Sequence, residues 1–260
     1  MIVEVERVSK EFVRGEQRVR AVDDVSLSVG QGEFVTIVGP SGCGKSTLLH
    51  LLGGFLEASS GTMRVAGNVV SRPGPDRGMM FQDLALFPWR TVSGNVGWAL
   101  EVQGRPARER DEIAERYLQL VGLRSFKNAY PHELSGGMKQ RVALARLLAF
   151  DPAVLLMDEP FGSLDAQTRE LMQEELQRIW SETRKTVLFV THDIDEAVYL
   201  GDRVIVFTAR PGRIKADIQV DLPRPRPIEV KKSTAFFDHR NHVWDLLRDE
   251  VLRARAEESA

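Results

Sequence analysis

The sequence predicts an α/β fold with a mostly parallel sheet, an N-terminal antiparallel β subdomain and an inserted α-helical subdomain. Residues 2–8 and 22–29 alternate apolar and polar side chains with period two, which favours half-buried antiparallel strands. Apolar runs and helical segments alternate in residues 33–55 and 153–208, which favours a parallel sheet. Between them, residues 91–150 have the 3.6-residue periodicity of helices, so this stretch contains the predicted helical subdomain.

The individual elements follow in chain order. The compact apolar run of residues 33–39 predicts a buried strand, and residues 45–55 predict a helix directly after it. Short strands are expected at residues 61–67 and 77–82. Further along, helices are expected at 109–123, 135–150, 164–180, 195–200 and 238–256, strands at 153–160, 185–193 and 202–208, and a proline-rich linker at 222–230.

Composition limits the class of protein. A hydrophobic content of 43% in 260 residues is enough for a proper core, and 28% charged residues is ordinary for a soluble protein. The net charge of −2 gives no global electrostatic reason to expect nucleic acid or an anionic membrane as a partner. Cys43 is the single cysteine, which excludes an intramolecular disulfide and suits a reducing compartment. The sequence contains no apolar run of about 18 residues and no signal-peptide pattern, so a membrane role is expected to come through a partner.

The segment GPSGCGKST, Gly39–Thr47, fits the pattern G-x-x-x-x-G-K-[ST] between a predicted strand and a predicted helix. Glycines let the backbone wrap around phosphate oxygens, and successive N–H groups form an anion-binding nest. Lys45 is expected to reach the β- and γ-phosphates, and the Ser46 hydroxyl to bind Mg²⁺. An ordinary glycine-rich turn is the alternative, which the flanking elements disfavour, and Cys43 is interpreted as a small residue that fits the loop. The motif predicts a P-loop NTPase core whose nucleotide contacts are Gly39, Pro40, Ser41, Gly42, Cys43, Gly44, Lys45, Ser46 and Thr47.

Polar residues follow two of the predicted strands. Asp158 and Glu159 end the run VLLMDEP, at the strand edge where open α/β sheets bind ligands. Asp158 is expected in the Mg²⁺ shell, and Glu159, on the other side of the pleat, is expected to polarise the attacking water. An acidic turn before a proline is the alternative. His192 ends the next strand, where it is either structural or a hydrogen-bond donor to the transferred phosphate.

The segment ELSGGMKQR, residues 133–141, predicts a second anion-binding site in the same chain. Two glycines lead into a basic amphipathic helix, and the backbone N–H groups at such a helix start bind anions. One domain of this size does not obviously need two phosphate sites.

The ordered set of motifs resembles the nucleotide-binding subunit of an ABC transporter. The motifs that carry this resemblance are GPSGCGKST, Gln82 in MMFQD, LSGGMKQR, VLLMDEP, SLDA and His192. The resemblance implies an ATPase with ATP and Mg²⁺ as its ligands, and a head-to-tail homodimer in which each LSGG segment closes over the ATP of the other subunit. It covers residues 1–220, with the helical subdomain inserted at about 91–150, and leaves 221–260 as the linker and a C-terminal helix.

The resemblance also assigns roles to residues. It implies Lys45, Glu159 and His192 as catalytic residues and Ser46, Gln82 and Asp158 as the metal shell. It further implies nucleotide contacts from Phe12, Ser135, Gly136, Gly137 and Asp165. Phe12 is expected to stack on adenine, with a plain core position as the alternative. Met138 stands where the family commonly has Gln, which leaves the Ser and Gly donors in place.

A narrower resemblance links the chain to importers of nitrate, sulfonate and taurine, through residues 73–96 and 202–214 and the C-terminal tail. It implies transmembrane permease subunits, a periplasmic or lipoprotein solute-binding protein and a peripheral place on the cytoplasmic face of the inner membrane. An exporter or lipid-handling ATPase, or a non-transport ABC switch ATPase, are the alternatives. The resemblance implies that this subunit does not contact the transported solute.

The segment DLALFPWRTV, residues 83–92, is expected to contain a docking surface for a membrane subunit. It joins Gln82 to the helical subdomain and carries Leu86, Phe87, Pro88 and Trp89. An amphipathic helix of a permease is expected to lie against these apolar side chains. The alternative is that they pack between the core and the helices.

Overall fold

Strand β3, Phe34–Val38, lies inside the larger of two sheets and is buried on both faces. In the computed structural model, which describes residues 1–258, all five of its side chains are buried. Phe34 and Val38 join one apolar cluster, whereas Val35 and Ile37 join another on the opposite side. A strand buried on both faces reads as a continuous apolar run, which explains why the sequence predicted it without alternation.

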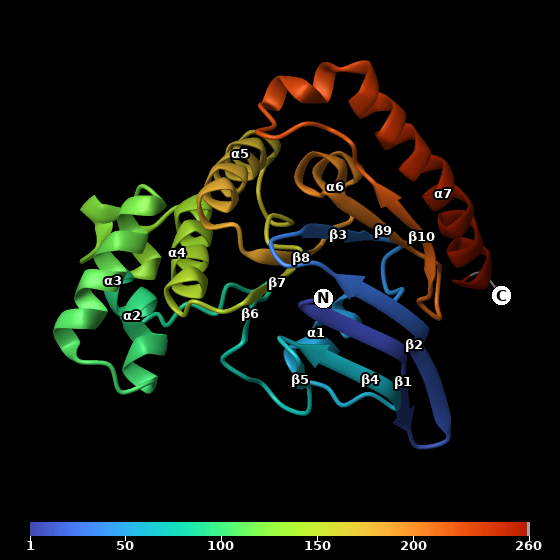
Figure 1. Cartoon of the computed structure of the whole chain (residues 1–260), viewed down its shortest axis with the longest axis horizontal. Helices are drawn as coiled ribbons and strands as arrows, with labels where there is room; N and C mark the ends of the chain where they lie inside the picture. The colour runs from blue at the N-terminus through green and yellow to red at the C-terminus, as the bar shows by residue number, and fades with distance from the viewer. Residues whose placement is uncertain (259–260) are drawn as a thin grey trace.

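The larger sheet has the strand order β10-β9-β3-β8-β7-β6 (Figure 1). All neighbours are parallel except β10, which pairs with β9 in the antiparallel sense, so the predicted mostly parallel sheet is confirmed. The strand β10 was not predicted, although Ile214, Ala216 and Ile218 alternate with polar residues. The other strands of this sheet are β6 (Arg77–Met80), β7 (Val154–Asp158), β8 (Thr186–Val190), β9 (Arg203–Phe207) and β10 (Ile214–Gln219).

The smaller sheet is antiparallel, as the period-two alternation predicted. Its strand order is β2-β1-β4-β5, with β1 (Val3–Arg14), β2 (Gln17–Val29), β4 (Ser60–Val65) and β5 (Asn68–Val69). The short β5 was not predicted. Side chains of both sheets share one buried cluster with Leu48, Leu49, Leu51 and Leu52 of helix α1 (Lys45–Gly53). The helix is therefore enclosed between the two sheets, which fixes the loop that precedes it.

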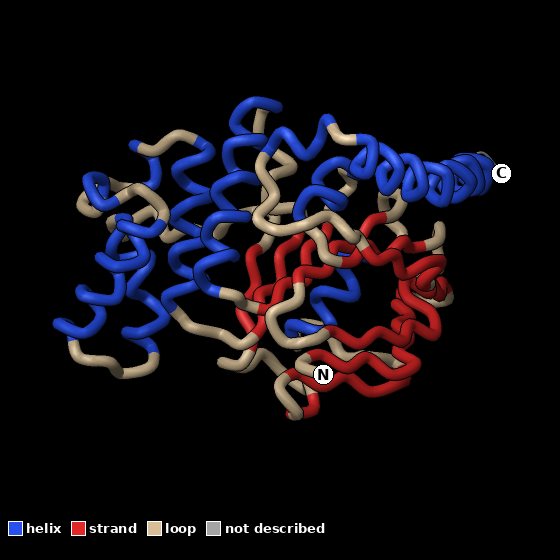
Figure 2. The backbone as a smooth tube through the Cα atoms, turned by 45° about the horizontal axis from the view of Figure 1, so that its top comes forward, coloured by secondary structure: helices blue, strands red, loops and turns tan. Residues whose placement is uncertain are grey.

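Helices fill the stretch predicted to hold an inserted subdomain. They are α2 (Val92–Val102), α3 (Ala107–Leu120) and α4 (Gly136–Ala149), with short 3-10 turns η1 (Arg124–Phe126) and η2 (Pro131–Glu133). The hydroxyl oxygens of Thr91 and Ser135 accept backbone N–H groups of the first turns of α2 and α4, so both helices begin at capping residues. Figure 2 shows these helices gathered at one end of the molecule and the strands at the other.

Three more helices cover the larger sheet: α5 (Ala166–Thr183), α6 (Ile194–Leu200) and the C-terminal α7 (Thr234–Glu258), which packs on α6 and β9 (Figure 1). The proline-rich segment that leads to α7, through η3 (Ile228–Lys232), is held by Arg226. This arginine is only 4% exposed, and its guanidinium donates to five backbone carbonyl oxygens, those of Val198, Tyr199, Gly201, Val220 and Leu222. The path of the chain into α7 is thus fixed by hydrogen bonds.

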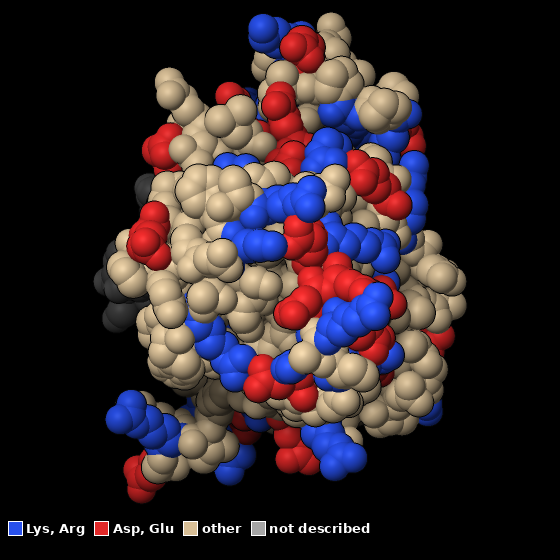
Figure 3. Space-filling model, turned by 90° about the vertical axis from the view of Figure 1, so that its left-hand side faces the viewer, with Lys and Arg blue, Asp and Glu red and all other residues tan. Residues whose placement is uncertain are grey.

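Within residues 1–258, no helix has both the length and the apolar content needed to cross a membrane. On the face that carries the helices α2 and α3, Lys and Arg side chains are interspersed with Asp and Glu (Figure 3). Several of these charges pair with each other, as Arg105 does with Glu109 and Arg124 with Glu115. This face therefore has no large area of a single charge.

Candidate active site

The phosphate-binding loop connects β3 to α1 and is built around two glycines with left-handed backbones. Gly42 has φ +71° and Gly44 has φ +109°, a region that glycine enters without strain. A Cβ on Gly44 would lie 2.4 Å from the carbonyl oxygen of Ala21, so β2 packs directly on the loop there. Lys45 begins α1 and is buried, and its Nζ donates to the carbonyl oxygens of Gly39 at 2.8 Å and Pro40 at 2.9 Å. The ammonium group therefore lies inside the turn of the loop.

Cys43 is buried inside this loop, and burial raises the pKa of its thiol. A neutral, enclosed thiol is a poor nucleophile. Its place in the loop agrees with the interpretation of a small residue that fits.

Ser46 and Asp158 meet across the edge of the sheet. The hydroxyl of Ser46, in the first turn of α1, donates to Oδ1 of Asp158, at the end of β7, at 2.8 Å. Asp158 is 7% exposed, and desolvation by burial raises the pKa of its carboxyl group above the usual value. A neutral hydroxyl offsets only part of that desolvation, so a buried carboxylate in this position is suited to a cation.

Glu159 and His192 also come together. Oε2 of Glu159 lies 2.9 Å from Nδ1 of His192, two residues past the end of β8. Glu159 has φ +44°, an unusual conformation for a residue with a side chain, and its N–H donates to the carbonyl oxygen of Val190. The strained turn after β7 therefore places this carboxylate beside the phosphate loop, where the two share a cavity of about 320 Å³.

Phe12 lines the same cavity. Its ring is 41% exposed, and Nζ of Lys10 lies 5.3 Å from the ring centroid. Phe12 is therefore a surface residue of the cavity, and the alternative of a core position does not hold. Besides Phe12 and Glu159, the predicted residues that line the cavity are Ser41, Gly42, Gly44, Lys45, Ser46 and Thr47.

Gln82 and Asp165 lie on other segments near the strand ends. Gln82 is exposed and follows β6, whose Met80 is level with Met157 of β7 in the parallel register. Gln82 and Asp158 thus leave the sheet at the same edge. Asp165 caps α5, and the N–H of Thr168, which donates to its carboxylate at 3.0 Å, lowers the pKa of Asp165. Neither residue lines the cavity.

The second predicted anion site is the start of α4, on a different helix from the one that follows the phosphate loop. Ser135 caps α4 and accepts the N–H of Met138 at 3.4 Å, and Gly136 and Gly137 form the first turn. Ser135 and Gly136 are exposed, and none of these residues lines the cavity of the phosphate loop. The half-buried Met138 packs against the core, so its side chain is not directed to the helix start.

Arg210 lines the cavity and was not predicted as a site residue. Its Nε and Nη2 donate to the carbonyl oxygen of Gly42 at 3.1 Å and 2.9 Å. The sequence contained one signal, a basic residue in a Pro-Gly turn directly after a buried strand. Val19 and Ala21 of β2, also not predicted, complete the lining.

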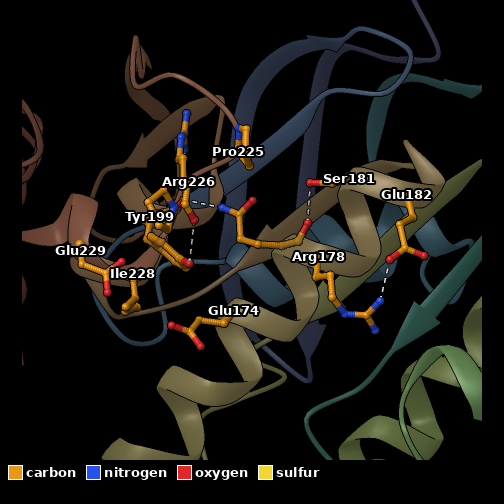
Figure 4. Close-up of a pocket in the computed structure, with 11 residues that line it drawn as sticks. Glu174, Arg178, Ser181, Glu182, Tyr199, Pro225, Arg226, Ile228 and Glu229 are labelled. Carbon is orange, nitrogen blue, oxygen red and sulfur yellow. Dashed lines mark hydrogen bonds and ion pairs between the residues drawn. The ribbon is translucent and has the colours of Figure 1, made fainter.

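A separate cavity of about 660 Å³ lies between α5, α6 and the segment before η3 (Figure 4). The Tyr199 hydroxyl donates to the carbonyl oxygen of Arg226 at 3.1 Å, and Arg178 pairs with Glu182 at its rim. None of the predicted site residues lines it. The hydrogen bond from Tyr199 contributes to holding the segment that leads to α7.

Comparison with known proteins agrees with the geometry. The ABC transporter family profile matches residues 22–162. An uncharacterized ABC transporter ATP-binding protein of Methanocaldococcus jannaschii is 51% identical over 252 residues, 97% of this chain and 93% of that protein. The nitrate import ATP-binding protein NrtD of Synechocystis sp. is 46% identical over 95% of this chain and 96% of its own length. The taurine import ATP-binding protein TauB of Roseobacter denitrificans is 45% identical over 90% of each.

A solved structure is also similar, a dimeric post-hydrolysis state of an ATP-binding cassette bound to ADP and Pi. Its TM-score is 0.74 at 33% identity, over 85% of this chain and all of that one. The family profile covers more than half of the chain, and the relatives match this chain over 90% or more of its length. The chain therefore belongs to the ABC transporter family, as an ATP-binding and ATP-hydrolysing subunit.

Proposed function

We propose that this chain hydrolyses ATP to drive the import of a small solute with an anionic group, such as nitrate, a sulfonate or taurine. One observation carries the proposal: the phosphate loop, the Ser46–Asp158 pair and the Glu159–His192 pair converge at one edge of the parallel sheet. The import direction is supported by the two relatives that are nitrate and taurine import proteins.

Each catalytic residue has a role that follows from its contacts. Lys45 binds the β- and γ-phosphates, because a hydrogen bond from its ammonium group to an anionic phosphate oxygen is stronger than one to a neutral loop carbonyl. A water oxygen attacks the γ-phosphorus, the bond to the β–γ bridging oxygen breaks, and Glu159 accepts the proton that the water loses. His192 orients this carboxylate through Nδ1 and stabilises charge on the transferred phosphoryl group.

The residues at the strand edge fit Mg²⁺. Ser46, Asp158 and Gln82 offer a hydroxyl, a desolvated carboxylate and an amide oxygen, the hard donors that this ion prefers. In residues 1–258 no cluster of three or more His, Cys, Asp or Glu forms a full protein cage. A Mg²⁺ site that takes its remaining ligands from phosphate and water needs no such cage. When bound, the ion supplies positive charge beside the phosphates.

The exposed ring of Phe12 is proposed to stack on adenine at the open end of the cavity. The start of α4, with Ser135, Gly136 and Gly137, is proposed to contact the γ-phosphate bound by a second copy of the chain, with Asp165 at the interface. The start of α4 does not line the cavity of its own chain, and a head-to-tail two-fold dimer would form both shared sites with one surface. The similar solved cassette is a dimer.

The docking surface is proposed to be the aromatic cluster of the half-buried Phe87 and the exposed Trp89 and Trp98. Ring centroids of Phe87 lie 5.6 Å from Trp89 and 4.8 Å from Trp98, and Trp89 is 72% exposed. The buried Asn95 fixes the segment, because its Oδ1 accepts the Phe87 N–H and its Nδ2 donates to the Phe87 carbonyl. A preformed apolar cluster of this kind suits an amphipathic helix of a permease.

Arg146 of α4 connects this surface to the site. Its guanidinium donates to the carbonyl oxygens of Leu84 and Ala85, each at 2.7 Å, between Gln82 and the aromatic cluster. A movement of α4 relative to the nucleotide cavity would therefore be transmitted to residues 83–92, which carry Phe87 and Trp89 of the docking surface. Through the permease the chain would lie peripherally at the cytoplasmic face of the inner membrane, and a periplasmic or lipoprotein solute-binding protein would deliver the solute.

Uptake measurements test the import proposal. Cells that lack the gene are complemented with the wild-type chain or with Glu159→Gln, and accumulation of labelled nitrate and taurine is followed. The wild-type chain should restore accumulation of one of these solutes, and the variant should not. The opposite result would be that cells without the gene take up both solutes as fast as complemented cells and export a lipid or a drug more slowly. That result would contradict import and favour an exporter.

A further inference from the structure

The loop between β9 and β10, residues 208–213, packs directly on the phosphate loop. Arg210 donates twice to the carbonyl oxygen of Gly42, at 3.1 Å and 2.9 Å. At Gly212 the two backbones are in close contact, since an added Cβ would lie 2.2 Å from the carbonyl oxygen of Cys43. The 208–213 loop therefore touches two consecutive residues of the phosphate loop.

The same loop is tied to the antiparallel sheet. The N–H of Gly212 donates to the carbonyl oxygen of Ala21 at 2.9 Å. The carbonyl oxygen of Gly212 accepts the N–H of Asp23 at 3.0 Å. Arg213 pairs with the carboxylate of Asp23. Because β2 also lines the nucleotide cavity, the 208–213 loop connects two of its walls.

A buried carboxylate of the C-terminal helix holds this loop in turn. Glu250 of α7 is 2% exposed, and it accepts the N–H of Ala209 at 2.9 Å and Nζ of Lys215 at 2.8 Å. Burial alone would raise the pKa of Glu250, but the hydrogen bonds from Lys215 and Ala209 outweigh it and hold this pKa below its usual value. The ionised carboxylate thus anchors the residue that directly precedes Arg210.

These contacts form a chain from α7 to the phosphate loop. Gly42 has φ +71°, and a glycine leaves its peptide unit free to rotate. The carbonyl oxygen is the negative end of that unit, and beside a triphosphate it would repel the ligand. The Arg210 guanidinium engages this oxygen and both fixes its direction and offsets its charge.

We propose that Arg210 is a positioning residue for the phosphate loop, and that α7 sets the affinity for ATP by holding Arg210 through Glu250. The proposal deepens the proposed function and rests on ATP binding at Gly39–Thr47. It gives the C-terminal helix a part in the nucleotide site, which it does not itself touch.

Nucleotide affinity, measured by displacement of a fluorescent ATP analogue, tests the first step. Arg210→Ala should raise the Kd for ATP roughly tenfold, because two hydrogen bonds from a charged donor are lost. Its kcat at saturating ATP should change by less than about threefold, since positioning acts on ground-state binding. Arg210→Lys, which keeps a charged donor, should recover most of the affinity. The matched control is Arg105→Ala, which removes an exposed guanidinium of the helical segment. Wild-type affinity in Arg210→Ala would overturn the proposal.

A double-mutant cycle tests the second step. Glu250→Gln should weaken ATP binding in the same direction, and it should add little in an Arg210→Ala background because both act through one chain of contacts. Its control is the neighbouring exposed Asp249→Asn, which should bind ATP within about twofold of wild type. Additive effects of the two changes, or full affinity in Glu250→Gln, would overturn the role of α7. Melting curves of all variants are recorded first, and ATP binding is then measured at a temperature at which every variant is folded.

Lys45→Ala separates this inference from the proposed function. If Lys45→Ala abolishes ATP binding and Arg210→Ala leaves it unchanged, only the inference fails. If Lys45→Ala binds ATP normally, the assignment of the phosphate loop in the proposed function fails, and the inference about Arg210 fails with it.

Discussion

The carboxylate of Glu159 and the imidazole of His192 lie 2.9 Å apart although their residues leave the sheet on different strands. Asp158 is level with Val190 in the register of β7 and β8, and the Glu159 N–H donates to the Val190 carbonyl oxygen. Parallel pairing therefore brings the two strand ends to one height and places the Glu159 carboxylate beside the His192 ring. When Nδ1 carries the proton, the imidazole donates to the carboxylate and fixes its direction.

Replacement of the histidine should slow catalysis more than binding. His192→Ala removes the group that orients Glu159, so kcat for ATP should fall roughly 10²-fold, while the Kd for ATP should stay within about threefold. Steady-state hydrolysis and nucleotide titration give the two values. His242→Ala on the exposed face of α7 is the control. A kcat close to wild type would remove His192 from the mechanism.

Asp158→Asn should make the protein more stable and less active. Because desolvation raises the pKa of this carboxyl group on folding, its contribution to stability falls as pH rises through the interval between the unfolded and folded pKa. The penalty is therefore present wherever the carboxyl group is ionised in the folded protein. Asn retains an acceptor for Ser46 without the charge, so the melting temperature at pH 7.5 should rise by roughly 2–4 °C.

The same variant should lose Mg²⁺-dependent hydrolysis. The exposed Asp221→Asn is the matched control and should alter neither property. An Asp158→Asn protein that melts lower at neutral pH would contradict the electrostatic reasoning. One that still hydrolyses ATP with Mg²⁺ at the normal rate would contradict the metal assignment.

The two anion sites should complement each other between subunits. Lys45→Ala disables the phosphate loop and Ser135→Arg blocks the start of α4, so each variant alone should be inactive. In a mixed head-to-tail dimer, one shared site has both lesions and the other has neither. ATPase activity of an equimolar mixture should recover toward about a quarter of wild type, since random pairing puts half of the chains in mixed dimers with one intact site. Recovery in a sample shown to be monomeric would exclude shared sites.

The aromatic cluster should matter for assembly and not for folding. Trp89→Ser should leave the melting temperature and ATP binding unchanged, because this side chain is 72% exposed. Co-purification with the permease and solute uptake should fail, because a central aromatic anchor is lost. The control is Trp244→Ser, also an exposed tryptophan but on α7. If Trp89→Ser unfolds the isolated chain, the cluster is part of the core and the docking proposal is wrong.

Much of the site could be predicted because it is local in the sequence. The phosphate loop and the Asp158–Glu159 strand end each depend on a contiguous segment whose strand and helix context is visible in the apolar pattern. The parallel sheet followed from the same alternation of strands and helices. The predicted fold class is therefore confirmed, and it rests on patterns within single strands and helices.

What the sequence left open depends on contacts between distant segments. Arg210 reaches Gly42 across 168 positions, and no local pattern reports a distance of that kind. Phe12 and Trp89 are exposed because the fold leaves one side of each ring uncovered. Hydrophobicity alone does not reveal which apolar side chains stay uncovered. The missed strand β10 is different, because its alternation of Ile and Ala with polar residues was readable.

Glu159→Gln tests the central claim most directly. The variant keeps the shape of the side chain and removes the carboxylate that accepts the proton. Single-turnover hydrolysis and sizing chromatography with ATP are measured on the same sample. The account predicts hydrolysis at least about 10³-fold slower, ATP affinity close to wild type and an ATP-bound dimer that accumulates on the column. Hydrolysis near the wild-type rate would show that the strand-edge carboxylate is not the base, and would contradict the proposed mechanism.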